Sequence, residues 1–199
     1  MSSPAPRYSP RLDEAVALAV ADFRHHVRKG TSIPYITHLF SVMSLVGEYG
    51  GDEDQLIAAV LHDWLEDVKG AHPQFLEDRF GPRVRRLVLG LTDTMEHPKP
   101  PWRARKEAYL AHLGSEPAEL KLISAADKLH NCQTIRMDLA AIGDAVWQRF
   151  SGGKDGSLWY YQQVAIAIAH DWDHPLSRRL TREVGAMTAE ANRAAEAGS

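Results

Sequence analysis

The chain has 199 residues, the length of one ordinary domain, and its composition excludes several classes of protein. Lys and Arg total 23 and Asp and Glu total 26, so the formal net charge of -3 provides no basic footprint for nucleic acid or for a membrane surface. The single cysteine, Cys132, excludes an internal disulfide and a cysteine-rich zinc module. Because the sequence shows neither a long apolar stretch nor an apolar N-terminal run, we expect no membrane span, no signal peptide and a cytoplasmic location.

Apolar residues recur at helical spacing along nearly the whole chain. In chain order, the pattern predicts helices around residues 16–20, 39–46, 53–68, 82–91, 103–113, 117–140, 157–170 and 175–195. Gly50 and Gly51 should end the second helix, Asp52 should cap the third, and Pro82 should begin the fourth. Exposed loops are expected at about 29–36, 92–102 and 151–156. We therefore predict an all-α fold, a single bundle of roughly seven to nine helices over residues 11–190, with flexible termini at 1–10 and 191–199.

The predicted helix over residues 53–68 separates its side chains into two faces. At about 100° per residue, four of them fall within an arc of about 140° opposite an apolar face. They are His62, Asp63, Glu66 and Asp67. A solvated acidic face is the ordinary interpretation, but it usually includes Lys or Arg partners, and none comes before Lys69. A bound cation would relieve the repulsion among the three carboxylates, and imidazole nitrogen is a ligand that first-row metals favour.

Two residues on other predicted helices could complete a metal site. His38 begins the second helix, directly after a loop that contains Gly and Pro. Asp127 lies in an otherwise apolar helical stretch, where a carboxylate needs a salt bridge, a solvent-facing position or a metal. Asn131 and Thr134 follow at spacings that place them on the same helix face as Asp127. The residues alone leave these alternatives open.

Three segments resemble, in order and spacing, the motifs of the HD-domain metal-dependent phosphohydrolases. In detail they resemble the motifs of the hydrolase domain of RelA/SpoT-type proteins and of the stand-alone small alarmone hydrolases. The segments are RKGTSIPYITH at 28–38, LHDWLED at 61–67 and ADKLHN at 126–131, and the similarity extends over roughly residues 15–165. The resemblance implies one Mn²⁺ per chain, with His38, His62, Asp63 and Asp127 as its ligands. It also implies that Glu66 and Asp67 position the attacking water and handle its protons.

The same resemblance assigns residues to the substrate side of the site. The positions that contact the nucleotide in such enzymes are here Arg28, Lys29, Asn131 and Thr134. The segment 92–106 adds a local basic cluster that could meet phosphates in this acidic chain, although each of its members could also be a solvated surface charge. The cluster consists of Lys99, Arg103, Arg105 and Lys106. Lys154, with Tyr160 or Tyr161, could flank the same opening.

Most of the ten histidines have no predicted role in the chemistry. Phe23, His25 and His26 stand where many relatives carry His, Gly and Gln, a departure that concerns the base pocket. His130 is interpreted as a packing residue or as a residue that supports a metal ligand, and no histidine set suits a second metal. The others without a partner pattern are His72, His97, His112, His170 and His174. Cys132 is expected in the core.

The resemblance implies a Mn²⁺-dependent phosphohydrolase that removes 3′-pyrophosphate from an alarmone of the stringent response, (p)ppGpp or (p)ppApp. We expect no synthetase domain in this chain, because little sequence follows the hydrolase motifs. One alternative is a phosphatase with the same site that acts on another nucleotide, either on the 2′-phosphate of NADPH or on a nucleoside monophosphate. Another is a non-catalytic nucleotide-sensing module, against which the presence of both Glu66 and Asp67 argues. The sequence leaves open the choice between guanine and adenine, and the oligomeric state.

Overall fold

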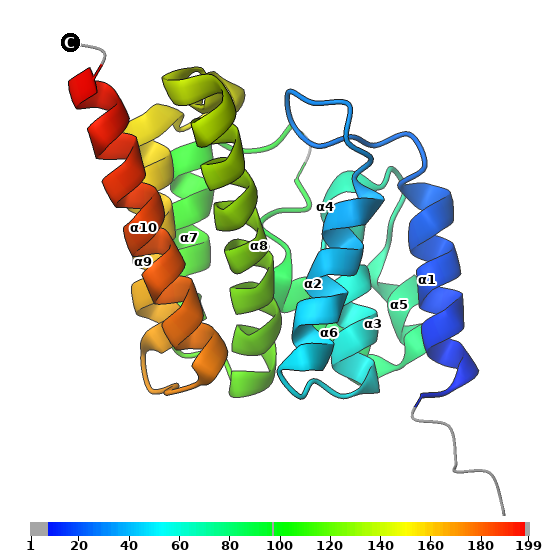
Figure 1. The fold of residues 1–199 in the computed structure, drawn as a ribbon. Helices are drawn as coiled ribbons and strands as arrows, with labels where there is room; N and C mark the ends of the chain where they lie inside the picture. The colour runs from blue at the N-terminus through cyan, green and yellow to red at the C-terminus, as the bar shows by residue number, and fades with distance from the viewer. Residues whose placement is uncertain (1–7, 97, 198–199) are drawn as a thin grey trace, which may run out of the picture. The chain divides into compact units, whose positions relative to one another are not determined.

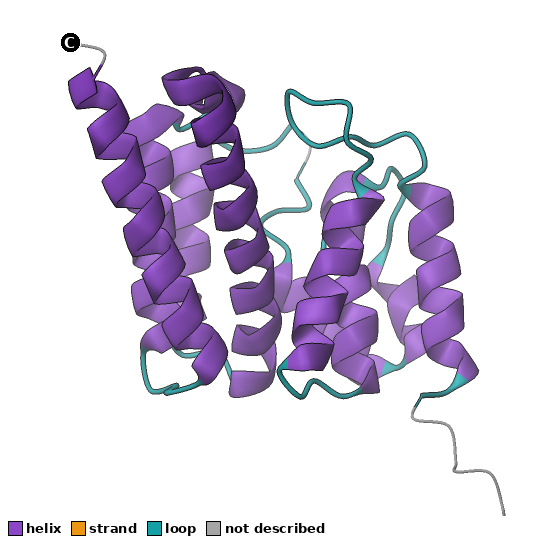
Figure 2. Ribbon diagram, in the orientation of Figure 1, coloured by secondary structure: helices purple, strands orange, loops and turns teal. Residues whose placement is uncertain are grey.

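The computed structural model describes residues 8–96 and 98–197, and all named elements within these ranges are helices (Figures 1 and 2). In chain order they are α1 (Pro10–Asp22), α2 (Ile36–Glu48), α3 (Glu53–Val60), α4 (Trp64–Asp67), α5 (Pro73–Phe80), α6 (Pro82–Leu91), α7 (Trp102–Leu113), α8 (Ala118–Ile142), the 3-10 helix η1 (Gly143–Arg149), α9 (Gly153–Ala169) and α10 (Pro175–Ala197). The predicted all-α class is confirmed. None of the helices in the described ranges has the length and hydropathy needed to span a membrane.

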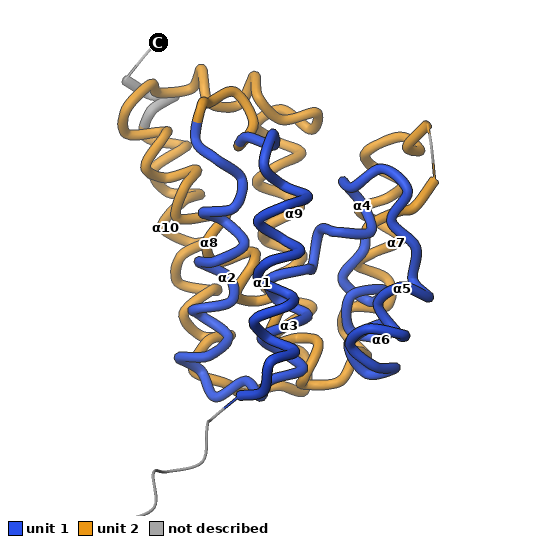
Figure 3. The backbone as a smooth tube through the Cα atoms, turned by 90° about the vertical axis from the view of Figure 1, so that its right-hand side faces the viewer, with its two compact units in different colours: residues 1–27, 33–92 blue, residues 28–32, 93–199 orange. Residues whose placement is uncertain are grey.

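The helices divide into two compact units (Figure 3). Unit 1, blue in Figure 3, contains α1 to α6. Unit 2, orange, contains α7 to α10 with η1, and it also includes residues 28–32, the short segment that interrupts unit 1 in sequence.

In unit 1, α3 packs against α1, α2 and α6, and α5 packs against α6. The predicted start of α3 is confirmed in detail. The Asp52 carboxylate accepts a hydrogen bond from the Gln55 amide at 3.0 Å, and the Gln55 side chain accepts one from the Asp52 amide at 3.0 Å. This reciprocal capping box satisfies two amides that a helix start leaves without helical partners. The helices α2 and α3 pack against each other, and apolar side chains of both, including Leu39, Val42 and Ile57, are fully buried.

The prediction of one continuous helix over residues 53–68 was wrong. α3 ends at Val60, a turn follows over 61–63, and α4 begins at Trp64. Asp63 has φ −96° and ψ 2°, outside the helical range, and the Trp64 amide bonds to the Leu61 carbonyl at 2.9 Å. The Ala59 carbonyl, which a continuous helix would pair with the amide of residue 63, accepts a hydrogen bond from the His62 ring at 2.8 Å. His62 and Asp63 therefore lie at a helix break, where their side chains are not bound to helical spacing.

In unit 2, α8 packs against α9, α10 and η1, and α7 packs against α9. Three features differ from the sequence prediction. The helices α5 and η1 were not predicted, because segments of seven or eight residues contain too few turns for a clear apolar period. α9 begins at Gly153, within the expected loop at 151–156. α10 continues to Ala197, beyond the expected domain boundary at residue 190.

Candidate metal and nucleotide site

Two of the predicted metal ligands are buried histidines of unit 1. His38 lies in the first turn of α2 with 1% of its surface exposed, and His62 lies in the turn after α3 with 3% exposed. Their ring centroids are 5.1 Å apart. Because the Ala59 carbonyl can only accept, the His62 Nδ1 carries the proton of their 2.8 Å hydrogen bond. This bond fixes the ring and leaves the lone pair of Nε2 as the donor for a metal.

Asp63 brings a carboxylate to the same two rings. Its Oδ2 lies 3.0 Å from His62 Nε2 and 3.9 Å from His38 Nε2. An imidazole lone pair that faces a carboxylate oxygen at this distance favours a cation, either a proton or a metal ion, between the two atoms. The Tyr35 hydroxyl donates a hydrogen bond to the same oxygen at 2.6 Å. Sequence reasoning did not single out Tyr35, although it lies three residues before His38 in the first motif.

The fourth predicted ligand, Asp127, lies on α8 in unit 2 and is buried, with 6% of its surface exposed. Its Oδ1 accepts a hydrogen bond from the Asn131 side-chain amide at 2.5 Å, and its Oδ2 pairs with Lys128. The carboxylate is therefore held in one orientation and has a basic neighbour. The Lys128 ammonium lies 5.6 Å from the centroid of the Tyr109 ring, a cation–π contact.

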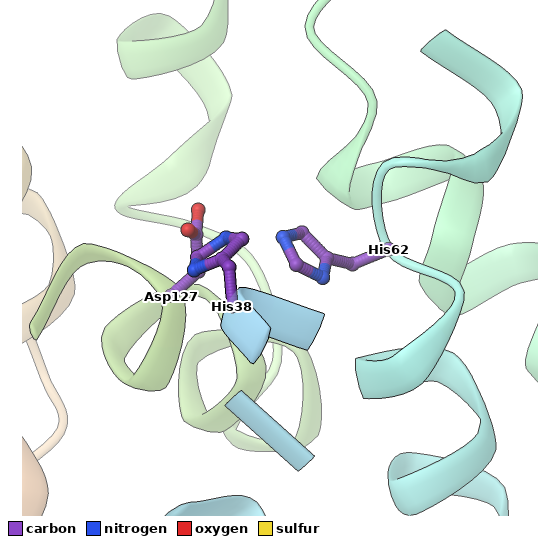
Figure 4. Close-up of side chains that lie close together, drawn as sticks. All are labelled: His38, His62 and Asp127. Carbon is purple, nitrogen blue, oxygen red and sulfur yellow. The ribbon is translucent and has the colours of Figure 1, made fainter. Parts of the chain in front are cut away.

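Within the described residues, one group of three buried side chains could hold a metal ion: His38, His62 and Asp127 (Figure 4). One potential ligand atom from each lies within 4.8 Å of those of the other two. Two imidazole nitrogens and a carboxylate oxygen suit divalent first-row metals. The chain therefore has a candidate metal site. Asp63 is not part of this group of three, but it contacts both histidines as described above.

The predicted catalytic pair follows directly after Asp63. Glu66 and Asp67 lie on α4, and their amides bond to the Asp63 carbonyl at 3.2 and 3.0 Å. Glu66 is half-buried and Asp67 is exposed. The Asp67 carbonyl also lies 3.3 Å from His26 Nε2, so one of the histidines without a predicted role lies next to α4.

Three of the predicted nucleotide-binding residues lie together in unit 2. The Arg28 guanidinium donates to the Asn131 side-chain oxygen at 2.6 Å and to the Thr134 hydroxyl at 3.2 Å. Because Asn131 also donates to Asp127, a row of hydrogen bonds connects Arg28 to a candidate metal ligand. Lys29, the fourth residue of this set, is exposed.

The predicted basic cluster is organised by an acidic residue that sequence reasoning missed. The Asp93 side chain is only 7% exposed, and it pairs with Arg105 and with the Lys106 ammonium, the latter at 3.1 Å. Arg105 Nε also donates to the Pro100 carbonyl at 3.0 Å, so this guanidinium connects two points of the loop before α7. Lys99 is exposed on that loop. Both cations already pair with the Asp93 carboxylate. Their contact with a substrate phosphate stays a prediction.

Arg103 and Lys154, both weighed as surface or substrate-side residues, also have partners. Arg103 lies over the Trp159 ring, 3.3 Å from its centroid, and Lys154 donates to Asp144 at 3.0 Å and to the Ala191 carbonyl at 2.7 Å.

Two of the remaining histidines accept hydrogen bonds at the starts of helices. His72 and His174 accept hydrogen bonds through Nδ1 from the amides of Gln74 and Leu176, each at 3.2 Å, near the starts of α5 and α10. His97 lies outside the described residues. Cys132 is fully buried in unit 2, as expected for a core residue, and burial raises the pKa of its thiol.

The chain is similar in sequence to two proteins of named activity. It is 31% identical to the guanosine-3′,5′-bis(diphosphate) 3′-pyrophosphohydrolase of Aquifex aeolicus (strain VF5) over 130 residues, which are 65% of this chain and 18% of that protein. It is 34% identical to the guanosine-3′,5′-bis(diphosphate) 3′-pyrophosphohydrolase MESH1 of Danio rerio over 114 residues, 56% of this chain and 60% of the relative. The chain thus spans less than two thirds of the length of either relative.

A solved structure shows the same fold. It belongs to a metazoan ortholog of SpoT that hydrolyzes ppGpp and plays a role in starvation responses; the TM-score is 0.73 at 22% identity, over 96% of this chain and 98% of the other. The model of the HD domain family matches residues 15–158, which include His38, His62, Asp63 and Asp127. The chain therefore belongs to the HD domain family.

Proposed function

We propose that the protein is a metal-dependent phosphohydrolase that removes pyrophosphate from the 3′ position of an alarmone, (p)ppGpp or (p)ppApp. In this reaction water adds to phosphorus, the bond to the ribose 3′ oxygen breaks, and the products are a nucleoside 5′-di- or triphosphate and pyrophosphate. The observation that carries the proposal is the buried group of His38, His62 and Asp127 in a chain of the HD domain family. The names of the relatives support this substrate class.

We assign one Mn²⁺ per chain to His38, His62, Asp63 and Asp127. The residues fit a divalent cation, because the His62 ring is turned by Ala59 so that Nε2 is the donor atom, and the Asp63 carboxylate is held by Tyr35. A ligand set of two nitrogens and two oxygens is more typical of a site for manganese or iron than of a closed site for structural zinc. A metal ion at such a site supplies Lewis acidity, which lowers the pKa of water and polarises a phosphoryl oxygen.

The other predicted site residues are assigned to activation of water and to binding of the substrate. Glu66 and Asp67 on α4 orient the attacking water and accept its proton. Arg28, with Asn131 and Thr134, orients the nucleotide, and Lys29 lies next to Arg28 in the chain. The basic residues Lys99, Arg105 and Lys106 are assigned to the substrate phosphates.

The domain that carries this function is assigned to residues 11–190. A net charge of -3 favours a small nucleotide as the partner over nucleic acid, and the single cysteine suits the reducing cytoplasm.

Turnover of a small substrate panel tests the proposal. We would incubate the full chain with ppGpp, ppApp and NADPH, each with Mn²⁺ and with a chelator, and identify the released phosphate species. We expect pyrophosphate from ppGpp or ppApp, only in the presence of metal. Orthophosphate from NADPH alone would assign the site to a different nucleotide. Binding of ppGpp without release of any product would indicate a sensing module and would overturn the proposed activity.

A matched pair of variants ties the activity to the site. Glu66→Gln removes the charge of a proposed catalytic carboxylate, whereas Glu107→Gln makes the same change on the exposed surface of α7, where Glu107 pairs with Arg103 at 2.7 Å. Only Glu66→Gln should lower kcat. Equal activity of the two variants would contradict the role of Glu66.

A further inference from the structure

Residues 28–31 form a tight turn within unit 2. The amide and the hydroxyl of Thr31 both donate to the Arg28 carbonyl, at 3.0 and 2.9 Å, and close the turn. Gly30, at the third position, has φ +68°, in the left-handed region that favours glycine. The turn thus fixes the backbone from which the Arg28 side chain departs.

The backbone of this turn rests on the side chain of Arg149, the last residue of η1. A Cβ atom added to Gly30 would lie 2.7 Å from Arg149 Cδ and 2.8 Å from its Nε, closer than real Cβ atoms approach other atoms. Arg149 is itself held in place, because its Nη1 donates to Asp138 on α8 at 2.6 Å and only 19% of its side chain is exposed. Both the φ angle and the lack of space therefore require glycine at position 30.

The helix that anchors Arg149 also receives the Arg28 side chain. Arg28 bonds to Asn131 and Thr134, and Asp138 follows Thr134 by four residues, so these three α8 residues lie on one face of the helix. The turn is thus attached to this face in two ways: directly through the Arg28 guanidinium, and indirectly through Arg149 beneath Gly30.

We propose that Arg149 is a positioning residue for nucleotide recognition. Anchored by Asp138, it supports the 28–31 turn and keeps the Arg28 guanidinium at Asn131 and Thr134, in the orientation that meets the nucleotide. The inference rests on the proposed function, because it takes Arg28 as a nucleotide contact. A merely structural Arg149–Asp138 pair would change stability alone, whereas a positioning residue changes KM and the mobility of the turn.

The test uses the full chain loaded with Mn²⁺ and compares Arg149→Ala with Arg149→Lys. Lysine retains the aliphatic stem and the charge, and it can replace arginine here because a single nitrogen meets Asp138. We expect Arg149→Ala to lower kcat/KM for ppGpp roughly 10- to 100-fold, mainly through KM, with unchanged Mn²⁺ affinity. The Thr31 amide should exchange its hydrogen faster, and Arg149→Lys should restore both properties.

Arg136→Ala is the matched control. Arg136 lies on the same helix and pairs with Glu183 and with Glu190, to which its Nε donates at 2.9 Å. Its loss should lower the thermal midpoint and leave KM and the exchange of the Thr31 amide unchanged. Arg149→Ala with wild-type KM and exchange, or an Arg136→Ala variant with the same KM defect, would overturn the inference. If the wild type neither bound nor hydrolysed ppGpp or ppApp, the proposed function would fail, and the exchange of the Thr31 amide would still decide whether Arg149 supports the turn.

Discussion

Replacing Tyr35 with phenylalanine removes one hydroxyl group, and with it the hydrogen bond from Tyr35 to Asp63, so the effect of that bond can be measured. The Tyr35 ring stacks on Phe23 with their centroids 5.5 Å apart, a contact that phenylalanine can retain. The lost bond joins a hydroxyl to a carboxylate at 2.6 Å, the short distance typical of charge-assisted hydrogen bonds. Such bonds contribute about 1.5–3 kcal/mol. Loss of a partner that orients a metal ligand typically weakens metal affinity ~10- to 100-fold, which corresponds to ~1.4–2.8 kcal/mol. The two estimates agree.

We therefore expect Tyr35→Phe to bind Mn²⁺ with ~10- to 100-fold lower affinity. Calorimetric titration of the metal-free protein with Mn²⁺ would measure this directly, and kcat at saturating Mn²⁺ should recover most of the wild-type value. Tyr8→Phe makes the same chemical change on a side chain of unit 1 that is 51% exposed, and it should leave the affinity unchanged. Wild-type affinity in Tyr35→Phe would refute the view that Tyr35 orients a metal ligand.

Three further predictions concern the site and the fold. Asp63→Ala should abolish Mn²⁺ binding and turnover together, whereas Glu66→Ala should retain the metal and lose kcat; full activity in either would contradict its role. Ser9 caps α1, and its hydrogen bonds to Glu53 lower the pKa of that carboxyl group. The interaction between Ser9 and Glu53 therefore contributes its full stability above the ordinary pKa of glutamate, and this stability is lost as the pH falls through the lowered pKa of Glu53. Ser9→Ala should therefore cost about 1 kcal/mol at pH 7 and less in acid, as denaturant titrations at both pH values would show. The buried Cys132 thiol, whose pKa burial raises, should react with iodoacetamide only after unfolding, and mass spectrometry of the native protein would detect any earlier reaction.

Local signals in the sequence were sufficient for much of the fold. Asp52, at the start of an apolar period, predicted the cap of α3, and Pro82 predicted the first residue of α6. Both depend on residues only a few positions apart, whose interactions are the same in most proteins. The motifs around His38, His62 and Asp127 likewise identified three side chains that the structure buries as a candidate metal site.

The helix break at residues 61–63 could not be predicted from periodicity, because a 3.6-residue period continues through the segment and only the folded chain shows that His62 takes the Ala59 carbonyl. Local sequence patterns also do not predict which distant residues contact the candidate ligands. Tyr35 approaches Asp63 across 28 positions of sequence.

The sequence by itself determined the helical class and the positions of most helices, since these follow from short-range spacing and residue type. The candidate ligands came from the resemblance of three motifs to a known family. Only the tertiary structure decided which side chains contact the candidate ligands and the residues proposed to bind the nucleotide. Asp93 pairs with Arg105 and Lys106 of α7, 12 and 13 positions later in the chain, and Arg149 lies under Gly30 although 119 positions separate them in sequence. Partners at such separations are set by the packing of whole helices, and no local pattern records them.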